Sequence, residues 1–214
     1  MKIKKIGMVL MTAALFSGLA CTAETAQAAG SLGMPLTREG GTARAMSMGS
    51  AVVGVPQDSS SLFWNPAGLG TIECMELGLH HNNGLGESIH ETAVIGMPIG
   101  ILGGLAASIN YVDNGIFEGR DSVGNVTDNY TAGDLSVNLG WGKKLFSGIS
   151  AGMAVKYNRQ ALANKVYSAY AMDLGLLWNP ISRLNLGLAY SNLGTNVATS
   201  LLDSGWRVGA SYGV

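Results

Sequence analysis

The chain has 214 residues, of which 13% are charged and 31 are glycine, and its formal net charge is −1. This balance offers no basic face, so we expect no nucleic-acid partner. The charged fraction is about half, and the glycine share about twice, the soluble average. Such a composition favours a transmembrane β-barrel, whose apolar residues occupy alternate positions of many short strands. A glycine-rich soluble secreted β-protein is the alternative.

Residues 1–28 are predicted to be an export signal. A basic start is followed by a mostly apolar stretch, 6–19, which is short for a membrane helix, and Ala26-Gln27-Ala28 fits a cleavage site. Cys21 offers a second processing route, lipidation, for which the preceding residues fit less well. After cleavage only Cys74 remains, so no disulfide is expected within the chain.

Residues 29–71 are predicted to form a plug, or hatch, because this small-residue-rich segment lies between the signal and a series of strands. Asn65-Pro66 predicts a turn that ends any preceding helix. Gly49, Gly54 and Gly68 would allow close backbone approach to a wall. Arg44 and Asp58 are expected to pair in an interior of low dielectric, where an unpaired charge is costly. Asp58 as a surface turn residue is the alternative.

Eight strands are predicted from a two-residue period of apolar side chains. Leu135, Val137, Leu139 and Trp141 show the pattern clearly. The intervening positions are small or polar rather than long and charged, which suits a barrel interior better than a face in water. The expected ranges are 75–81, 90–98, 103–112, 132–142, 149–158, 166–178, 184–191 and 205–213.

Aromatic residues end several apolar faces, as in the girdles at membrane interfaces, although β-propensity alone also favours them. They are Tyr111, Trp141, Tyr157, Trp178, Tyr190 and Tyr212. The connections are predicted to alternate between short (99–102, 143–148, 179–183) and longer (82–89, 113–131, 159–165, 192–204). Short periplasmic turns and long external loops are typical of outer-membrane barrels.

The longest predicted loop, 113–131, contains Glu118, Arg120 and Asp121 among turn-forming residues that mark it as exposed. A recognition or gating role and a plain solvated connection both remain open for it.

No catalytic residue, metal site or cofactor is predicted, so the chain is not expected to be an enzyme. Residues 209–213 fit the G-x-S-x-G pattern of hydrolases, but no histidine follows them. His80 and His81 are adjacent on a predicted strand and would point to opposite faces.

These segments together resemble the PorV/PorQ family of outer-membrane proteins, distant relatives of FadL-type transporters. The matching residues are Arg44-Ala45-Met46, Met48-Gly49, Asp58, the run Trp64-Asn65-Pro66-Ala67-Gly68-Leu69, and the segments 117–121 and 172–177. The resemblance implies an N-terminal hatch whose core is Arg44, Asp58, Asn65, Pro66 and Gly68.

The resemblance also implies a multi-pass barrel in the cell outer membrane that transports hydrophobic compounds or takes part in export. A scaffold that binds exported proteins through external loops, as in type IX secretion, is the alternative. The implied partners are outer-membrane lipids, hydrophobic small molecules or exported proteins.

One departure from the family concerns strand number. An eight-stranded barrel is just filled by its own side chains, so it cannot also hold a plug. A truncated chain, a plug outside the barrel, and several chains that combine are the three explanations, and we expect truncation. The predicted fold class is therefore all-β: an incomplete antiparallel transmembrane β-barrel, residues 72–214, with an N-terminal plug.

Overall fold

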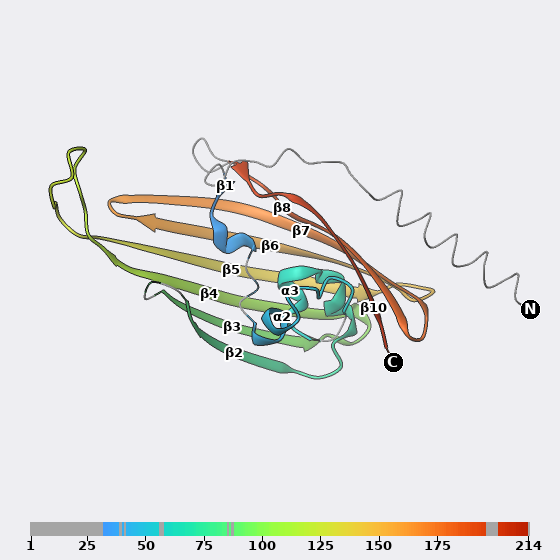
Figure 1. The fold of residues 1–214 in the computed structure, drawn as a ribbon. Helices are drawn as coiled ribbons and strands as arrows, with labels where there is room; N and C mark the ends of the chain where they lie inside the picture. The colour runs from blue at the N-terminus through green and yellow to red at the C-terminus, as the bar shows by residue number, and fades with distance from the viewer. Residues whose placement is uncertain are drawn as a thin grey trace, which may run out of the picture. The chain divides into compact units, whose positions relative to one another are not determined.

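The computed structural model describes residues 32–38, 40, 42–55, 58–84, 86, 88–195 and 201–213. The predicted signal peptide and the start of the predicted plug lie outside these residues. The described chain is rich in β-structure and has only short helices (Figure 1). No helix in the described ranges is long and apolar enough to cross a membrane.

The expected eight strands are confirmed as one antiparallel sheet in the order β10-β8-β7-β6-β5-β4-β3-β2. Their bounds are β2 Glu76–Asn83, β3 Ile89–Pro98, β4 Gly104–Phe117, β5 Tyr130–Lys144, β6 Ile149–Leu162, β7 Lys165–Ile181, β8 Leu184–Gly194 and β10 Gly205–Tyr212. In this part of the chain β2 and β10 are free edges, so the sheet is open. Two short strands, β1 (Leu32–Gly33) and β9 (Leu201–Leu202), pair in parallel beside it.

Several strands run further than predicted, which corrects two of the expected loops. β4 continues through Asn114-Gly115 because the turn residues are absorbed by a register shift between Asp113 and Ile116, where Gly115 has a φ of +80°. The loop is therefore 118–129 rather than 113–131. The connection expected at 159–165 is a two-residue turn, 163–164, so the predicted alternation of loop lengths holds only in part.

The sheet has a covered face, which carries the N-terminal residues, and a bare face. On β5, Asp134, Ser136 and Asn138 point to the covered face and are buried. Leu139, on the bare face, is 54% exposed. The same alternation runs along β4, β6, β7 and β8, so the small and polar side chains are inside and the apolar ones outside. This polarity is the reverse of a sheet that packs its apolar face on a core.

The N-terminal residues form four short helices on the covered face (Figure 1): η1 Pro35–Arg38, α2 Ala43–Ser47, α3 Ser61–Trp64 and η2 Pro66–Thr71. A further short helix, η3 (Gly100–Leu102), lies in the β3–β4 turn. Helices this short are not stable alone. Leu62, Phe63, Leu69 and Ile72 bury against Val94, Ala106 and Ala154 of the sheet, and this packing holds α3 and η2 in place.

Candidate functional site

A row of glycines on the covered face receives the N-terminal segment (residues 42–72). We call this row the glycine seat: Gly140, Gly142, Gly152, Gly175, Gly187 and Gly209. A Cβ atom at Gly152 would collide with the Pro66 carbonyl, and one at Gly187 would collide with the Val53 carbonyl. Backbone therefore lies directly on backbone at these two glycines, whereas Gly140 faces the Leu62 side chain and Gly175 the Asn65 side chain. Sequence reasoning missed this seat, although the alternating glycines on β5 were a visible signal.

Asn65 is the residue that fastens the segment to the seat. Its side-chain Nδ2 donates to the carbonyls of Val53, at 2.9 Å, and Leu176, at 3.0 Å. Its Oδ1 accepts the Ala67 N–H at 3.2 Å and so caps η2. Pro66 follows at the first helical position, where a missing N–H costs nothing. The turn predicted at Asn65-Pro66 is therefore a helix cap that joins two parts of the segment to β7.

The neighbours of Asn65 in the predicted motif lie in the same contact. Ala67 and Gly68 are buried, and the Gly68 carbonyl accepts the Thr71 hydroxyl at 2.7 Å. Trp64 lies under the guanidinium of Arg207, which is 5.2 Å from the ring centroid. Arg207 also donates to the Phe63 carbonyl at 3.1 Å, so β10 holds the end of α3. The sequence did not suggest this role of Arg207.

Gly49 has a different role from the one expected. No described atom lies within 4 Å of the position its Cβ would take, so it makes no close approach to the sheet. Its φ of +59° instead ends α2. Its N–H bonds to the Met46 carbonyl, and the next N–H, of Ser50, bonds to the Ala45 carbonyl. This is the αL cap that favours glycine after a helix.

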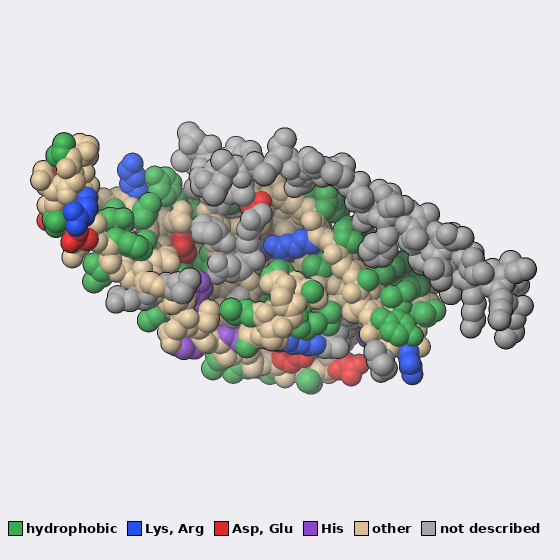
Figure 2. Space-filling view, in the orientation of Figure 1, with side chains coloured by type: hydrophobic (Ala, Val, Ile, Leu, Met, Phe, Trp, Pro, Cys, Tyr) green, Lys and Arg blue, Asp and Glu red, His purple; other side chains and the backbone are tan. Residues whose placement is uncertain are grey.

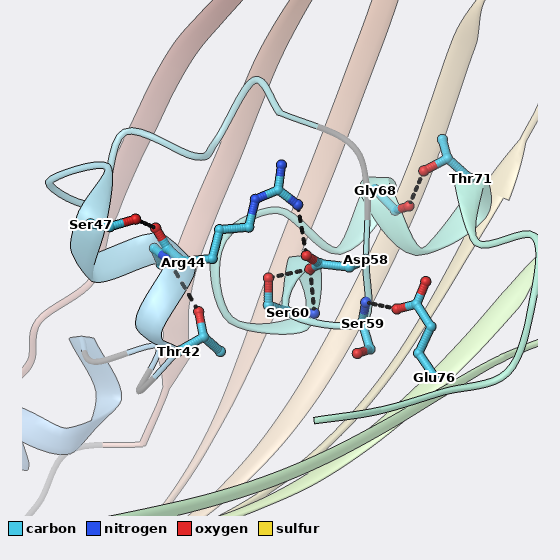
Figure 3. A network of polar contacts seen from close by, with 10 residues as sticks. Thr42, Arg44, Ser47, Asp58, Ser59, Ser60, Gly68, Thr71 and Glu76 are labelled. Carbon is cyan, nitrogen blue, oxygen red and sulfur yellow. Dashed lines mark hydrogen bonds and ion pairs between the residues drawn. The ribbon is translucent and has the colours of Figure 1, made fainter. Parts of the chain in front are cut away.

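Arg44 and Asp58 form the expected ion pair, with Arg44 Nη1 2.8 Å from Asp58 Oδ2 (Figure 3). The expectation of a low-dielectric interior was wrong, because the two side chains are 41% and 32% exposed. Asp58 Oδ1 also accepts from the Ser60 N–H, at 2.9 Å, and from the Ser60 hydroxyl. Partial burial would raise the pKa of Asp58, but the hydrogen bonds from Ser60 and Arg44 outweigh it and hold the pKa below its ordinary value.

Glu76 ties edge strand β2 to the same network, and the sequence gave no sign of this. Its carboxylate accepts the Ser59 N–H at 2.7 Å (Figure 3). Beside it lies a pocket of about 190 Å³ between α2, the turn at Asp58 and strand β2, lined in part by Arg44, Asp58 and His80. The hydrogen bond that Glu76 accepts from Ser59 therefore closes one side of this small polar pocket between the N-terminal segment and the sheet edge.

The candidate loop residues lie away from this site. Figure 1 shows the 118–129 loop projecting beyond the strand ends, and an isolated bridge joins Arg120 to Val126. Arg120 pairs with Glu118 and donates to the Gly124 carbonyl at 3.1 Å. Hydrogen bonds from the Asn125 side chain and from nearby backbone N–H groups lower the pKa of Asp121. The loop is therefore an ordered hairpin held by its charged residues.

The other charged and metal-ligating groups of the described residues lie apart from one another or in pairs. No group of three or more His, Cys, Asp or Glu side chains gathers there to hold a metal. Figure 2 shows charged side chains scattered over the covered face rather than gathered in one patch. A buried pair, Lys156 Nζ and Asp173 Oδ2 at 2.6 Å, links β6 to β7, and Lys156 also donates to Asn192 Oδ1 at 3.1 Å.

The pKa shift of Asp58 gives a pH dependence. Folding lowers this pKa below the ordinary value of 3.8. The ionised Asp58 carboxylate therefore stabilises the folded state fully above pH 3.8, and this stabilisation is lost as the pH falls through the lower pKa of the folded state. We expect Asp58→Asn to cost about 1 kcal/mol near pH 7 and almost nothing in strong acid. Urea unfolding of the wild type and the variant, from about pH 7 down to strong acid, measures this difference in the free energy of unfolding. Equal pH profiles for the two proteins would contradict the assignment.

Comparison with known proteins found no protein-family model that matches this chain and no curated protein with significant sequence similarity.

Proposed function

We propose that the chain forms the wall and the plug of an outer-membrane β-barrel that transports hydrophobic compounds, or exports molecules, across the outer membrane. The observation that carries this proposal is the reversed polarity of the sheet. Val137, Val155 and Leu176 are each more than 40% exposed on the bare face, while the covered face carries Ser136 and Asn158. A wall between lipid and a polar interior has this distribution.

The aromatic residues on the bare face support the same proposal. Trp178 and Tyr212 lie near the ends of β7 and β10 on the side of the 182–183 turn. Tyr157 packs on Tyr170, with ring centroids 5.2 Å apart, nearer the opposite end of the sheet. Two aromatic bands separated by aliphatic residues suit the two interfaces of a membrane.

The N-terminal segment would act as the plug, and its displacement would open the route. Part of its packing supports this role, because at Gly152 and Gly187 backbone lies on glycine and can separate without withdrawing a side chain there. Polar contacts fasten the segment to the sheet through Asn65 at β7, through Glu76 at β2, and through Arg207 and Ser211 at β10.

The scaffold alternative has one observation in its favour, which is the order of the 118–129 hairpin. Phe117 and Tyr130 stack at its base with centroids 5.3 Å apart, and Val123 near its tip is 80% exposed. A rigid hairpin that presents an apolar residue suits contact with another protein.

The test is to express the full chain in a Gram-negative host and separate the membranes by density. We expect the protein in the outer-membrane fraction, extractable only with detergent. We also expect an impermeant maleimide to label a Val123→Cys variant, made in a Cys74→Ser background, on intact cells. Recovery without detergent would overturn the membrane proposal and favour the soluble secreted alternative.

A deletion of residues 118–129 separates the two functions. Uptake of a hydrophobic fluorescent probe that survives the deletion supports transport. Loss of co-purifying proteins, with no probe uptake in either form, supports the scaffold.

A further inference from the structure

A polar row crosses five strands of the covered face, on the side of the glycine seat away from the turns at 145–148 and 182–183. Cross-strand pairing aligns its members, which we call the polar rung: His80, Thr92, Asn110, Ser136 and Asn158. Each neighbouring pair is directly opposite in the sheet, so the side chains stand side by side. The rung carries no carboxylate, lysine or arginine.

The rung leaves polar atoms unpaired although it is buried. Asn110 and Asn158 are 3% and 2% exposed. Asn110 Oδ1 and both polar atoms of the Asn158 amide have no hydrogen-bond partner among the described residues. A buried amide without a partner costs free energy that folding does not recover. Such groups call for an explanation, and a ligand or water that bonds to them is one.

The adjacent row shows that the same sheet can satisfy its polar groups. Asn138 accepts from Ser136 Oγ at 3.2 Å and donates to Ser108 Oγ at 2.9 Å. In that row Lys156 is neutralised by Asp173. Within the rung, the unpaired buried atoms belong to Asn110 on β4 and Asn158 on β6, with Ser136 of β5 between them.

The surroundings of the rung indicate the chemistry of its ligand. Lys156, in the adjacent row on one side, is paired with Asp173, and Asp134 lies buried in the adjacent row on the other side. A carboxylate brought to the neutral amides of Asn110 and Asn158 would lose water without gaining an opposite charge from them, which is costly. Amide and hydroxyl groups instead match an uncharged solute rich in hydroxyls.

A buried apolar cluster adjoins one end of the rung. Asn158 is paired with Ala169, which belongs to a buried cluster with Met34, Ala171 and Leu202. A molecule that bridges the rung and this cluster has a hydroxylated head and an alkyl part.

We propose that the polar rung binds the head group of an uncharged, hydroxyl-bearing amphiphile through Asn110 and Asn158, with the alkyl part against the Met34 cluster. This site rests on the proposed function, because it takes the covered face as the lining of a route across the membrane. It narrows the transported class to neutral amphiphiles rather than fatty-acid anions.

The test uses two probes of equal alkyl length, hexyl glucoside and hexanoate, with the full chain in lipid nanodiscs. Saturation-transfer NMR should detect glucoside binding with the sugar protons most strongly saturated, and little binding of hexanoate. Asn158→Leu should weaken glucoside binding about tenfold or more. Its melting temperature should be unchanged or higher, because the amide makes no bond within the protein.

The matched control is Asn185→Leu, the same substitution on the same face near the short turns, where Asn185 donates to Ser211 at 3.1 Å. It should leave glucoside affinity unchanged. Equal affinity in Asn158→Leu and wild type, equal binding of both probes, or binding of neither, which would leave only ordered water at the rung, would each overturn the site.

A flux measurement in vesicles separates this proposal from the proposed function. Glucoside binding that depends on Asn158 without any flux would support the site and contradict transport. Flux that does not depend on Asn158, together with unchanged binding, would support transport and contradict the site.

Discussion

Gly152→Ala is expected to unseat the N-terminal segment. A single methyl group at this position would collide with the carbonyl of Pro66 and the N–H of Ala67, neither of which is a flexible side chain. Either η2 moves outward or β6 bends, and overpacking of this kind costs about 1–3 kcal/mol. Urea unfolding in detergent should show a decrease of this size in the free energy of unfolding. Limited proteolysis should cut within residues 42–72 faster than in the wild type.

The matched control is Gly205→Ala in the same sheet. A Cβ atom at Gly205 would have no described atom within 4 Å, so the substitution adds a methyl group without a collision. Its unfolding free energy should stay within about 0.5 kcal/mol of the wild type. If the segment acts as a plug, Gly152→Ala should also raise probe uptake, and Gly205→Ala should not. Equal proteolysis of the two variants would show that the seat is not a close contact.

The strands were predictable because their pattern is local. A two-residue period needs only neighbouring residues, and all eight predicted ranges overlap an observed strand. The strand ends were not predictable in the same way. Residues 159–165 carry no apolar alternation, yet β6 extends to Leu162 and β7 begins at Lys165, because these ends pair with each other, as Gln160 does with Tyr167. Pairing with a neighbour overrides the local signal there.

The candidate site was predictable in its residue types but not in its contacts. The shortage of charges suggested that Arg44 and Asp58 pair, and they do. The partners of Asn65 were out of reach, because the Leu176 carbonyl lies 111 residues along the chain. The seat was missed for the same reason: the glycines were visible in the sequence, but the backbone that rests on them comes from a segment that lacks any periodic pattern.

Asn65→Leu is expected to be the most destabilising polar substitution in the segment. Asn65 is 4% exposed, and leucine has the same branched shape with bulkier methyl groups, so the change removes the hydrogen bonds and adds some bulk. It strands the Val53 carbonyl and the Ala67 N–H, and it removes the bond from Asn65 to the Leu176 carbonyl of the paired strand β7. Each stranded buried group costs about 1–3 kcal/mol, and partial relaxation brings the expected total to roughly 3 kcal/mol.

Asn158→Leu is the sharpest control for this loss, because it makes the same substitution at equal depth where the amide has no partner among the described residues. The two variants differ only in the hydrogen bonds that they remove. Chemical unfolding of both, side by side, should therefore place Asn65→Leu well below the wild type and Asn158→Leu at or above it. Equal losses would mean that bulk at these positions, and not the Asn65 hydrogen bonds, holds the segment on the sheet.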